Sequence, residues 1–393
     1  MKKRFLFNTI KKYIDHKNAL VITGMRQVGK TTLMKQVFDE VTAPKIWFDF
    51  DNPLDMLLFE EIDYNKIFQK LEKATGANGN RIFIFIDEIQ NLPEITKIIK
   101  YHIDHFNVKY IVTGSSNYYL KNLFPESLSG RKFLFILPPL SFQEYLVFTD
   151  KAVHEESNPD FNQIRMIQNR IEFEKRSMEY DNYLEFGGFP EVVLTKDIET
   201  KKAVLKNIFA SFFEKDIKIL TDIKDVRELR DLILLLVPRV GNLLDITKLA
   251  GELGINRVKI YNYLEFLEGV FFIELIPKFS KSIDRSIAGG KKLYFSDTGI
   301  LNIIGKVNDG QLFENAIANQ LKSYGNLSFY NQRNTAEIDF ILDKEIAFEV
   351  KINATENDLK RTKFLAEKIG LKESYILSKN YTDTDRTIFP MFL

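Results

Sequence analysis

The stretch VITGMRQVGKTTL, residues 21–33, decides the fold of the first part of the chain. It follows the apolar run ALVIT, precedes the helix-forming run TTLMKQVFDE, and holds the pattern Gly-x-x-x-x-Gly-Lys-Thr from Gly24 to Thr31. Glycines at such a strand-to-helix turn let backbone N–H groups surround phosphate oxygens while the helix N-terminus faces the anion. In this Walker A pattern Lys30 reaches the β- and γ-phosphates, and the Thr31 hydroxyl ligates Mg²⁺. We therefore predict a nucleotide site lined by Gly24, Met25, Arg26, Gln27, Val28, Gly29, Lys30, Thr31 and Thr32.

A second strand ends in two acids. The run RIFIFIDEIQ is apolar until Asp87 and Glu88, so the carboxyl end of the strand presents two adjacent carboxylates. A solvated strand end is the ordinary explanation of such a pair, but beside the loop at Lys30 the Walker B explanation is favoured. In that role Asp87 holds the magnesium shell, and Glu88 orients or deprotonates the attacking water.

Five short β-rich runs alternate with helix-patterned segments in the first 150 residues. Such alternation predicts an α/β fold, a parallel sheet with helices on both faces. Ser115 and Ser116 end the fourth run, where Ser115 either senses the γ-phosphate or caps a turn, with no preference between the two. Arg131 begins the fifth run and either stabilises transferring phosphate, in cis or in trans, or is an ordinary surface arginine. The five runs are ALVITG, KIWFDF, RIFIFIDE, YIVTGSS and KFLFILPP.

Composition narrows the class of protein further. The 393 residues predict two or three domains, and 45% hydrophobic with 28% charged residues is typical of a globular chain. With no cysteine, disulfides, thiolate metal sites and cysteine nucleophiles are excluded. The positively charged start is broken at Asn8 before a signal peptide would be complete, and no apolar run approaches the roughly 18 residues of a transmembrane helix. We therefore expect a cytoplasmic protein without membrane insertion.

The rest of the chain reads as three further segments. Residues 151–180 are polar and charged, with Pro159 as a breaker, and indicate a boundary. Two short helices around Gly254, followed by apolar hairpin material, indicate a winged-helix-like segment. The predicted domains are an ATPase domain at 1–150, a helical connector at 151–240, the winged-helix-like segment at 241–290 and a small α/β domain at 291–393.

The winged-helix-like segment offers candidate nucleic-acid contacts. A recognition helix would begin near Asn256, Arg257, Lys259 and Tyr261. Residues 251–292 hold seven Lys and Arg against five Asp and Glu, and the whole chain has a formal net charge of +1. This is a weak electrostatic signal for DNA, so packing on the ATPase part or contacts with proteins are equally good explanations.

Taken together, the motifs resemble the AAA-plus superfamily ATPases of bacteria and archaea that carry a C-terminal domain of unknown function. Besides the two motifs above, the resemblance rests on VTGSSN, SLSGRKFLFILPPLSFQEYL, YLEFGGFPEVV, SFFEKDI, KKLYFSDTGIL and AEIDFIL…AFEVK. It implies an additional-strand P-loop ATPase core, a winged-helix-like middle and a C-terminal domain similar to the restriction-endonuclease fold. It does not indicate a substrate.

The C-terminal part also carries a candidate metal site. Glu349 and Lys351 share a strand face, and a hairpin would bring Asp339 to them. The set resembles the PD-(D/E)xK nuclease pattern, with Glu314 as the acid on the preceding helix, although no Pro precedes Asp339. Glu314, Asp339 and Glu349 would bind Mg²⁺ and Lys351 would position a water or offset charge. A half-exposed strand gives the same alternation, and such a domain can also keep the fold for binding alone.

The resulting expectation is an Mg²⁺-dependent ATP hydrolase that acts on nucleic acid through its C-terminal parts. ATP is preferred because the chain has no Asn-Lys-x-Asp guanine motif. The alternative is an ATP-driven switch for a protein partner, with an inactive nuclease-like domain, and a slow regulatory nucleotide-binding protein is a third. A homo-oligomer is needed if Arg131 acts in trans.

Overall fold

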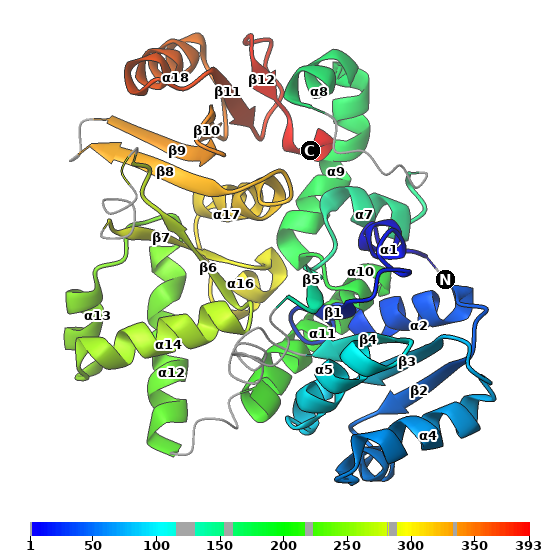
Figure 1. The fold of residues 1–393 in the computed structure, drawn as a ribbon. Helices are drawn as coiled ribbons and strands as arrows, with labels where there is room; N and C mark the ends of the chain where they lie inside the picture. Colours follow the sequence, from blue (N-terminus) through cyan, green and yellow to red (C-terminus); the bar gives the residue numbers. More distant parts are fainter. Residues whose placement is uncertain are drawn as a thin grey trace. The chain divides into compact units, whose positions relative to one another are not determined.

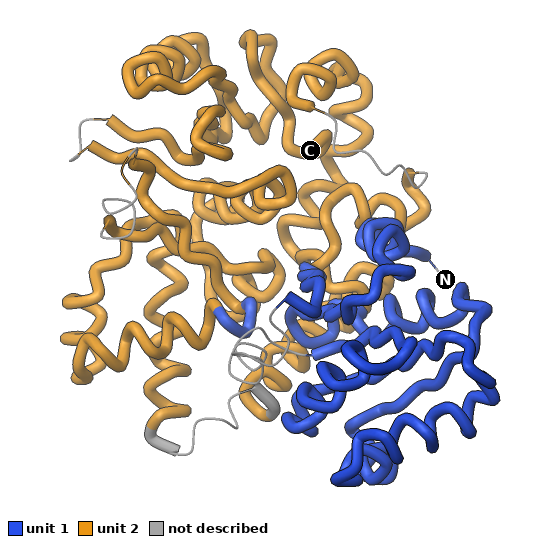
Figure 2. The backbone as a smooth tube through the Cα atoms, in the orientation of Figure 1, with its two compact units in different colours: residues 1–138, 269–271 blue, residues 139–268, 272–393 orange. Residues whose placement is uncertain are grey.

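The computed structural model divides the chain into two compact units. It describes residues 2–114, 130–152, 160–216, 223–280, 282, 289–332 and 336–393. Unit 1 comprises residues 1–138 with 269–271, and unit 2 comprises 139–268 with 272–393 (Figure 2). The expected ATPase domain at 1–150 thus contributes residues to both units, and most of the three segments expected after it lies in unit 2.

Unit 1 is built on a parallel sheet. Its five strands are the five β-rich runs of the sequence, which confirms the α/β prediction for this part (Figure 1). The order is β2-β3-β4-β1-β5, so β4 is the additional strand between the Walker A and Walker B strands. The bounds are β1 Ala19–Thr23, β2 Lys45–Asp49, β3 Ile82–Asp87, β4 Val108–Gly114 and β5 Lys132–Ile136. Strands β1, β3 and β4 are buried throughout, as expected for parallel strands covered on both faces.

Successive side chains of this sheet point to its two faces and take part in apolar packing on both. Val21 and Ile84 belong to a buried cluster with apolar residues of α4 and α5. On the other face Phe85 packs against Phe38 of α2, with ring centroids 5.0 Å apart. Because successive strand residues point to opposite faces, near-continuous apolar strands are required here. The helical segments are α1 Leu6–Lys11, α2 Lys30–Glu40, α3 Pro53–Met56, η1 Leu57–Glu60, α4 Tyr64–Thr75, η2 Ile89–Asn91 and α5 Ile95–His105.

Unit 2 begins with helices, two of which occupy the expected boundary at 151–180. The sequence marks this stretch as a boundary within a helical connector, and its described residues are helical, with Asp160 and Asn169 as helix N-caps. The helical segments up to residue 269 are α7 Phe142–Phe148, α8 Phe161–Ile167, α9 Arg170–Phe186, α10 Pro190–Leu194, α11 Ile198–Ser211, η3 Phe212–Asp216, α12 Ile223–Leu236, η5 Val237–Arg239, α13 Ile246–Leu253 and α14 Arg257–Gly269.

A helix-helix-hairpin arrangement follows α12. Gly254 ends α13 with a φ of 66°, and the Asn256 side chain accepts from Lys259 N at 2.8 Å at the start of α14. Strands β6 (Ile273–Pro277) and β7 (Lys291–Phe295) pair antiparallel, and residue 243 bridges to Lys292. A further bridge from Lys278 to Phe329 joins this pair to the C-terminal sheet, which is why the two expected domains are one unit.

The C-terminal sheet mixes two strand directions. Its order is β12-β11-β10-β9-β8; β8, β9 and β10 pair antiparallel, whereas β10, β11 and β12 pair parallel. Helix α18 provides the crossover from β10 to β11 that parallel pairing requires. The sequence predicted β9 and β10 but not the other three strands. The bounds are α16 Thr298–Ile304, α17 Asp309–Leu321, β8 Leu327–Gln332, β9 Ala336–Leu342, β10 Ile346–Lys351, α18 Glu356–Ile369, β11 Glu373–Ser378, β12 Thr387–Ile388 and η6 Pro390–Phe392.

None of the helices in the described ranges combines the length and the apolar character that crossing a bilayer requires.

Candidate functional site

The phosphate loop owes its shape to its two glycines. Gly24 has a φ of 146°, and a Cβ at this position would lie 2.1 Å from the carbonyl oxygen of Leu137. Gly29 has a φ of 94° and immediately precedes α2. L-residues rarely adopt either conformation, so the glycines of the motif are needed for the backbone path itself.

Lys30 lies inside this loop. Its side chain is buried, and Nζ donates to the carbonyl oxygens of Gly24 at 3.0 Å and Met25 at 2.7 Å. Thr31 is half-buried and Thr32 is exposed, both in the first turn of α2. The Lys30 ammonium is therefore already held at the loop backbone, where the Walker A pattern predicts that phosphate oxygens bind.

Arg4 supports the loop from behind. This buried guanidinium donates to the carbonyl oxygen of Val28 and to that of Pro138, each at 2.8 Å. It thereby ties the loop to the chain that follows β5. Sequence reasoning missed Arg4, because nothing in the N-terminal run marks it apart from its charge.

Thr113 connects the two acids of β3. Its hydroxyl donates to Asp87 Oδ1 and accepts from the Glu88 backbone N at 3.2 Å. Glu88 adopts a φ of 54°, and its carboxylate accepts from the side-chain amide of Gln90. Since β4 lies between β3 and β1, Thr113 stands between the acids and the strand that leads into the loop. Sequence reasoning missed Thr113 and chose Ser115 two residues later, which lies outside the described residues, as does Ser116.

Arg131 does not join this site. Strands β5 and β1 are parallel, with Lys132 opposite Ala19, so Arg131 precedes the amino end of β5. The loop begins at Gly24, after the carboxyl end of β1, hence at the opposite edge of the sheet. There Arg131 Nε donates to Asp104 Oδ1 at 2.7 Å. Within this chain Arg131 thus lies away from the loop, because about five residues of extended strand, roughly 17 Å, separate the two edges.

The loop, the following helix and the acidic strand end define the class of unit 1: it is a P-loop domain of the ATPase type. Residues 16–146 match a family model described as an AAA domain. Residues 177–311 and 309–391 match two models described as domains of unknown function (DUF8612 and DUF4143).

Two curated relatives extend over most of the chain. An uncharacterized protein of Haemophilus influenzae is 29% identical over 386 residues, covering 93% of this chain and 90% of the relative. An uncharacterized protein of Methanocaldococcus jannaschii is 29% identical over 363 residues, covering 86% and 77%.

Among solved structures, a Walker-type ATPase of Pyrococcus abyssi has a TM-score of 0.49 at 14% identity, covering 76% of this chain and 94% of that one. The Orc1 protein of Aeropyrum pernix in complex with DNA has a TM-score of 0.31 at 11% identity, covering 76% and 90%.

The predicted C-terminal residues come together in unit 2. Asp339 Oδ2 accepts from Val350 N at 2.8 Å across the β9–β10 pair, and Lys351 Nζ lies 2.7 Å from Glu349 Oε1. Glu314 of α17 accepts from the Tyr294 hydroxyl at 2.7 Å.

Two residues that sequence reasoning did not select complete the group, Glu337 of β9 and Lys292 of β7. Lys292 Nζ lies 2.8 Å from Glu337 Oε1, 3.5 Å from Glu314 Oε1 and 3.8 Å from Asp339 Oδ1. We call Glu314, Glu337, Asp339 and Glu349, with Lys292 and Lys351, the C-terminal cluster.

Burial and charge shift the pKa values within the C-terminal cluster. Burial, reinforced by the neighbouring Asp339 carboxylate, raises the pKa of Glu314 and that of Glu349 to about 7 each. For Lys292, burial alone would lower the pKa, but Glu314, Asp339 and Glu337 outweigh it and raise the pKa to about 12. Across the described ranges no group of three or more Asp, Glu or His side chains is arranged to hold a metal ion. The predicted metal role of Glu314, Asp339 and Glu349 stays a prediction.

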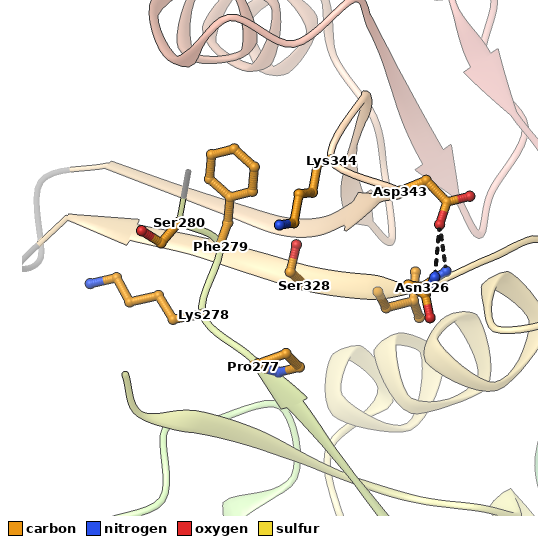
Figure 3. Close-up of a pocket in the computed structure, with 9 residues that line it drawn as sticks. Pro277, Lys278, Phe279, Ser280, Asn326, Ser328, Asp343 and Lys344 are labelled. Atoms are coloured by element: carbon orange, nitrogen blue, oxygen red, sulfur yellow. Dashed lines mark hydrogen bonds between the residues drawn. The ribbon is translucent and has the colours of Figure 1, made fainter. Parts of the chain in front are cut away.

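The pocket in Figure 3 lies elsewhere in unit 2. It has a volume of about 240 Å³ and lies at the β9–β10 turn, where Asp343 accepts from Asn326 N at 2.8 Å. Asp339 and Val350 meet at the other end of that hairpin, so the pocket contains no predicted site residue. Its lining residues are Pro277, Lys278, Phe279, Ser280, Asn326, Leu327, Ser328, Asp343 and Lys344.

The start of α14 uses two of its four candidate nucleic-acid contacts internally. Asn256 caps the helix, and Lys259 Nζ lies 2.6 Å from Asp225 Oδ1 and also contacts Glu228. Arg257 and Tyr261 are exposed. Of the four residues that the sequence offered for contacts with nucleic acid, Arg257 and Tyr261 therefore remain exposed for such contacts.

Three motifs of the resemblance meet at Asp297, which is a structural joint. The buried carboxylate accepts from Gly188 N at 2.7 Å and from Ile300 N at 2.9 Å. A Cβ on Gly188 would lie 2.2 Å from the Leu140 carbonyl oxygen, and one on Gly299 would lie 2.2 Å from that of Phe186. The sequences LSFQEYL, FGGFPE and SDTG are therefore explained by close backbone packing rather than by chemistry.

Proposed function

We propose that unit 1 binds ATP with Mg²⁺ and hydrolyses it. The observation that carries this proposal is the loop geometry: Lys30 is buried within the curve of the glycine-rich backbone, one strand away from the Asp87–Thr113–Glu88 group. Lys30 and the loop N–H groups bind the phosphates, and the dipole of α2 favours the negative charge.

The donor set near the loop suits Mg²⁺. A threonine hydroxyl at Thr31 and a buried carboxylate at Asp87 are hard oxygen ligands of the kind that this ion prefers. When bound, Mg²⁺ neutralises charge on the phosphate oxygens. Thr113 fixes the Asp87 oxygen and the Glu88 backbone, so that Glu88 is held at the strand end, where it orients the attacking water.

The nucleotide-binding part is tested by isothermal titration of ATP into Lys30→Ala. We expect loss of detectable binding, because Lys30 and Arg26 carry the two charged side chains of the loop and the variant removes that of Lys30. Lys35→Ala is the matched control, since Lys35 is an exposed lysine on the same helix. Unaltered ATP affinity in Lys30→Ala would contradict the proposal.

For the target of the ATPase, we propose a protein-directed switch rather than an enzyme acting on nucleic acid. This is supported by the internal bonds of Asn256 and Lys259, which leave little positive charge at the start of α14. Phosphate contacts by Lys and Arg supply most non-specific DNA affinity, so a surface with few of them binds weakly.

The two targets are separated by the ATPase rate with and without duplex and single-stranded DNA. We expect the same rate with DNA across a salt series from low to physiological ionic strength. Stimulation by DNA that falls steeply with salt, and that is lost in Arg257→Ala, would favour the nucleic-acid enzyme instead.

A further inference from the structure

Lys292 carries an inference about unit 2 that goes beyond ATP hydrolysis and does not depend on it. This lysine lies on β7, which pairs with β6 outside the five-stranded C-terminal sheet, and its side chain is only 4% exposed. Its ammonium reaches carboxylates from two other elements, Glu314 on α17 and both Glu337 and Asp339 on β9. A buried cation among several carboxylates is the arrangement in which a charged lysine is retained inside a protein.

Four of the oxygens that a divalent ion would need, on Glu314, Asp339 and Glu349, are already engaged. Glu314 Oε1 accepts from Tyr294 at 2.7 Å and contacts Lys292 at 3.5 Å. Asp339 Oδ2 accepts from Val350 N, and its Oδ1 faces Lys292 at 3.8 Å. Glu349 Oε1 is bound by Lys351 at 2.7 Å. The other oxygen of this carboxylate, Oε2, is buried and has no hydrogen-bond partner in the described structure.

Space and charge both oppose a metal at this place. Magnesium requires oxygens at about 2.0–2.1 Å in near-octahedral geometry, so an ion shared by Glu314 and Asp339 would lie beside the Lys292 ammonium that contacts the same two oxygens. Two cations so close repel each other strongly in a buried site. The backbone of Gly241 also lies close to Glu314, since a Cβ added at this glycine would lie only 3.1 Å from Oε1.

We propose that Lys292 is the resident cation of the C-terminal cluster and takes the place of the divalent ion that the nuclease-like pattern implies. The carboxylates of the wild-type chain then form ion pairs that hold β7 against β9 and α17, and they do not bind a metal ion. It follows that Asp339, Glu349 and Lys351 do not form a working metal-dependent nuclease centre while Lys292 occupies the cluster.

The test measures Mn²⁺ uptake in the absence of nucleotide. The ion that stays free in solution is quantified by electron paramagnetic resonance. We expect the wild-type chain and the double variant Glu314→Gln/Asp339→Asn to take up the same number of ions. Lys292→Met, which removes the cation and keeps a similar length, is expected to take up one more ion per chain. Lys291→Met is the matched control, because Lys291 is the exposed neighbour on the same strand.

Two outcomes overturn the proposal. One is an ion bound by the wild-type chain and lost in the double variant, a comparison that remains decisive if Lys292→Met fails to fold. The other is a folded Lys292→Met chain, shown by circular dichroism, that takes up no additional ion. A gain that disappears again when Glu314→Gln and Asp339→Asn are added to Lys292→Met supports it.

Discussion

At the scale of single residues, Thr113 shows how the candidate ATPase site is held together. Its hydroxyl uses both of its functions, one as donor to Asp87 and one as acceptor from the Glu88 backbone. Groups that orient a metal ligand or a catalytic acid in this way commonly affect activity although they touch no substrate. Thr113 is therefore a positioning residue for the proposed hydrolysis.

Thr113→Val is expected to lower the ATP hydrolysis rate about 10–100-fold, the usual range for loss of an outer-sphere partner. The substitution keeps the shape of the side chain but leaves Asp87 Oδ1 and Glu88 N without this partner. ATP affinity measured without Mg²⁺ should not change, since the loop is untouched. Thr113→Ser keeps the hydroxyl and should retain most of the rate, and a wild-type rate in Thr113→Val would refute the positioning role.

His102 gives unit 1 a pH-dependent stability. Its Nε2 lies 2.8 Å from the Tyr64 carbonyl oxygen, which can only accept, so Nδ1 is the unprotonated nitrogen and accepts from the Tyr110 hydroxyl at 2.6 Å. Burial lowers the pKa of His102 from 6.5 to about 4. As pH falls, the unfolded chain therefore takes up this proton first, and stability present above pH 6.5 is lost towards pH 4.

Because of this pKa shift, lowering the pH from 7.5 to 5 is expected to reduce the free energy of unfolding by about 2 kcal/mol. Urea unfolding can be followed by the fluorescence of Trp47, the single tryptophan of the chain, which stacks on Phe85 in unit 1. His102→Gln should show a correspondingly shallower pH dependence. Equal pH dependence in the two proteins would mean that His102 is not the responsible group.

At the scale of elements, the joint at Asp297 explains why unit 2 depends on small residues far apart in the sequence. Gly188 lies against the Leu140 backbone and donates to Asp297, so α9, α10 and α16 meet with almost no space between their ends. Burial raises the pKa of Asp297 to about 6, although backbone N–H groups of Gly188, Ile300 and Gly299 oppose the shift. Such packing leaves no room for an added methyl group.

Gly188→Ala is expected to destabilise unit 2 by about 3 kcal/mol, because the new Cβ would collide with a backbone carbonyl that cannot move aside alone. Gly251→Ala is the matched control: Gly251 lies inside α13 with no atom within 4 Å of the added Cβ, and alanine there should stabilise by about 0.5–1 kcal/mol. Hydrogen exchange of the amides around residues 183–190 and 297–301 measures the difference. Similar protection in both variants would contradict this account of the joint.

The elements themselves were largely predictable where the signal is local. The apolar strand β1, the glycine loop and the start of α2 are contiguous in sequence, and β3 is a continuous apolar run that ends in two acids, so these elements follow from residue types alone. The sequence left two explanations open for Arg131 because the choice depends on strand direction: it precedes a parallel strand, whereas phosphate sites lie at carboxyl ends. The bounds of α8 and α9 could not be predicted from the polar residues at 151–180, because a half-exposed helix and a boundary segment have similar compositions.

At the scale of the whole molecule, the residues that sequence reasoning missed are those that tertiary structure brings in. Arg4 reaches the loop from the N-terminal segment, and Thr113 reaches Asp87 only because β4 is inserted beside β3. Lys292 comes to Glu314 and Asp339 through the pairing of β7 with β6 and the bridge from Lys278 to Phe329 of the C-terminal sheet. Thr113 and Lys292 lie within the motifs VTGSSN and KKLYFSDTGIL, but neither the motifs nor the sequence around Arg4 indicates which partners these residues contact.

The most direct measurement is steady-state ATP hydrolysis by the purified full chain, with Mg²⁺ and with excess chelator, in wild type and Glu88→Gln. We predict turnover by the wild type that requires Mg²⁺, and loss of turnover in Glu88→Gln with ATP binding preserved, because the variant keeps the loop and Asp87 but removes the group that orients water. Mg²⁺-independent turnover, or a wild-type rate in Glu88→Gln, would contradict the assignment of this site.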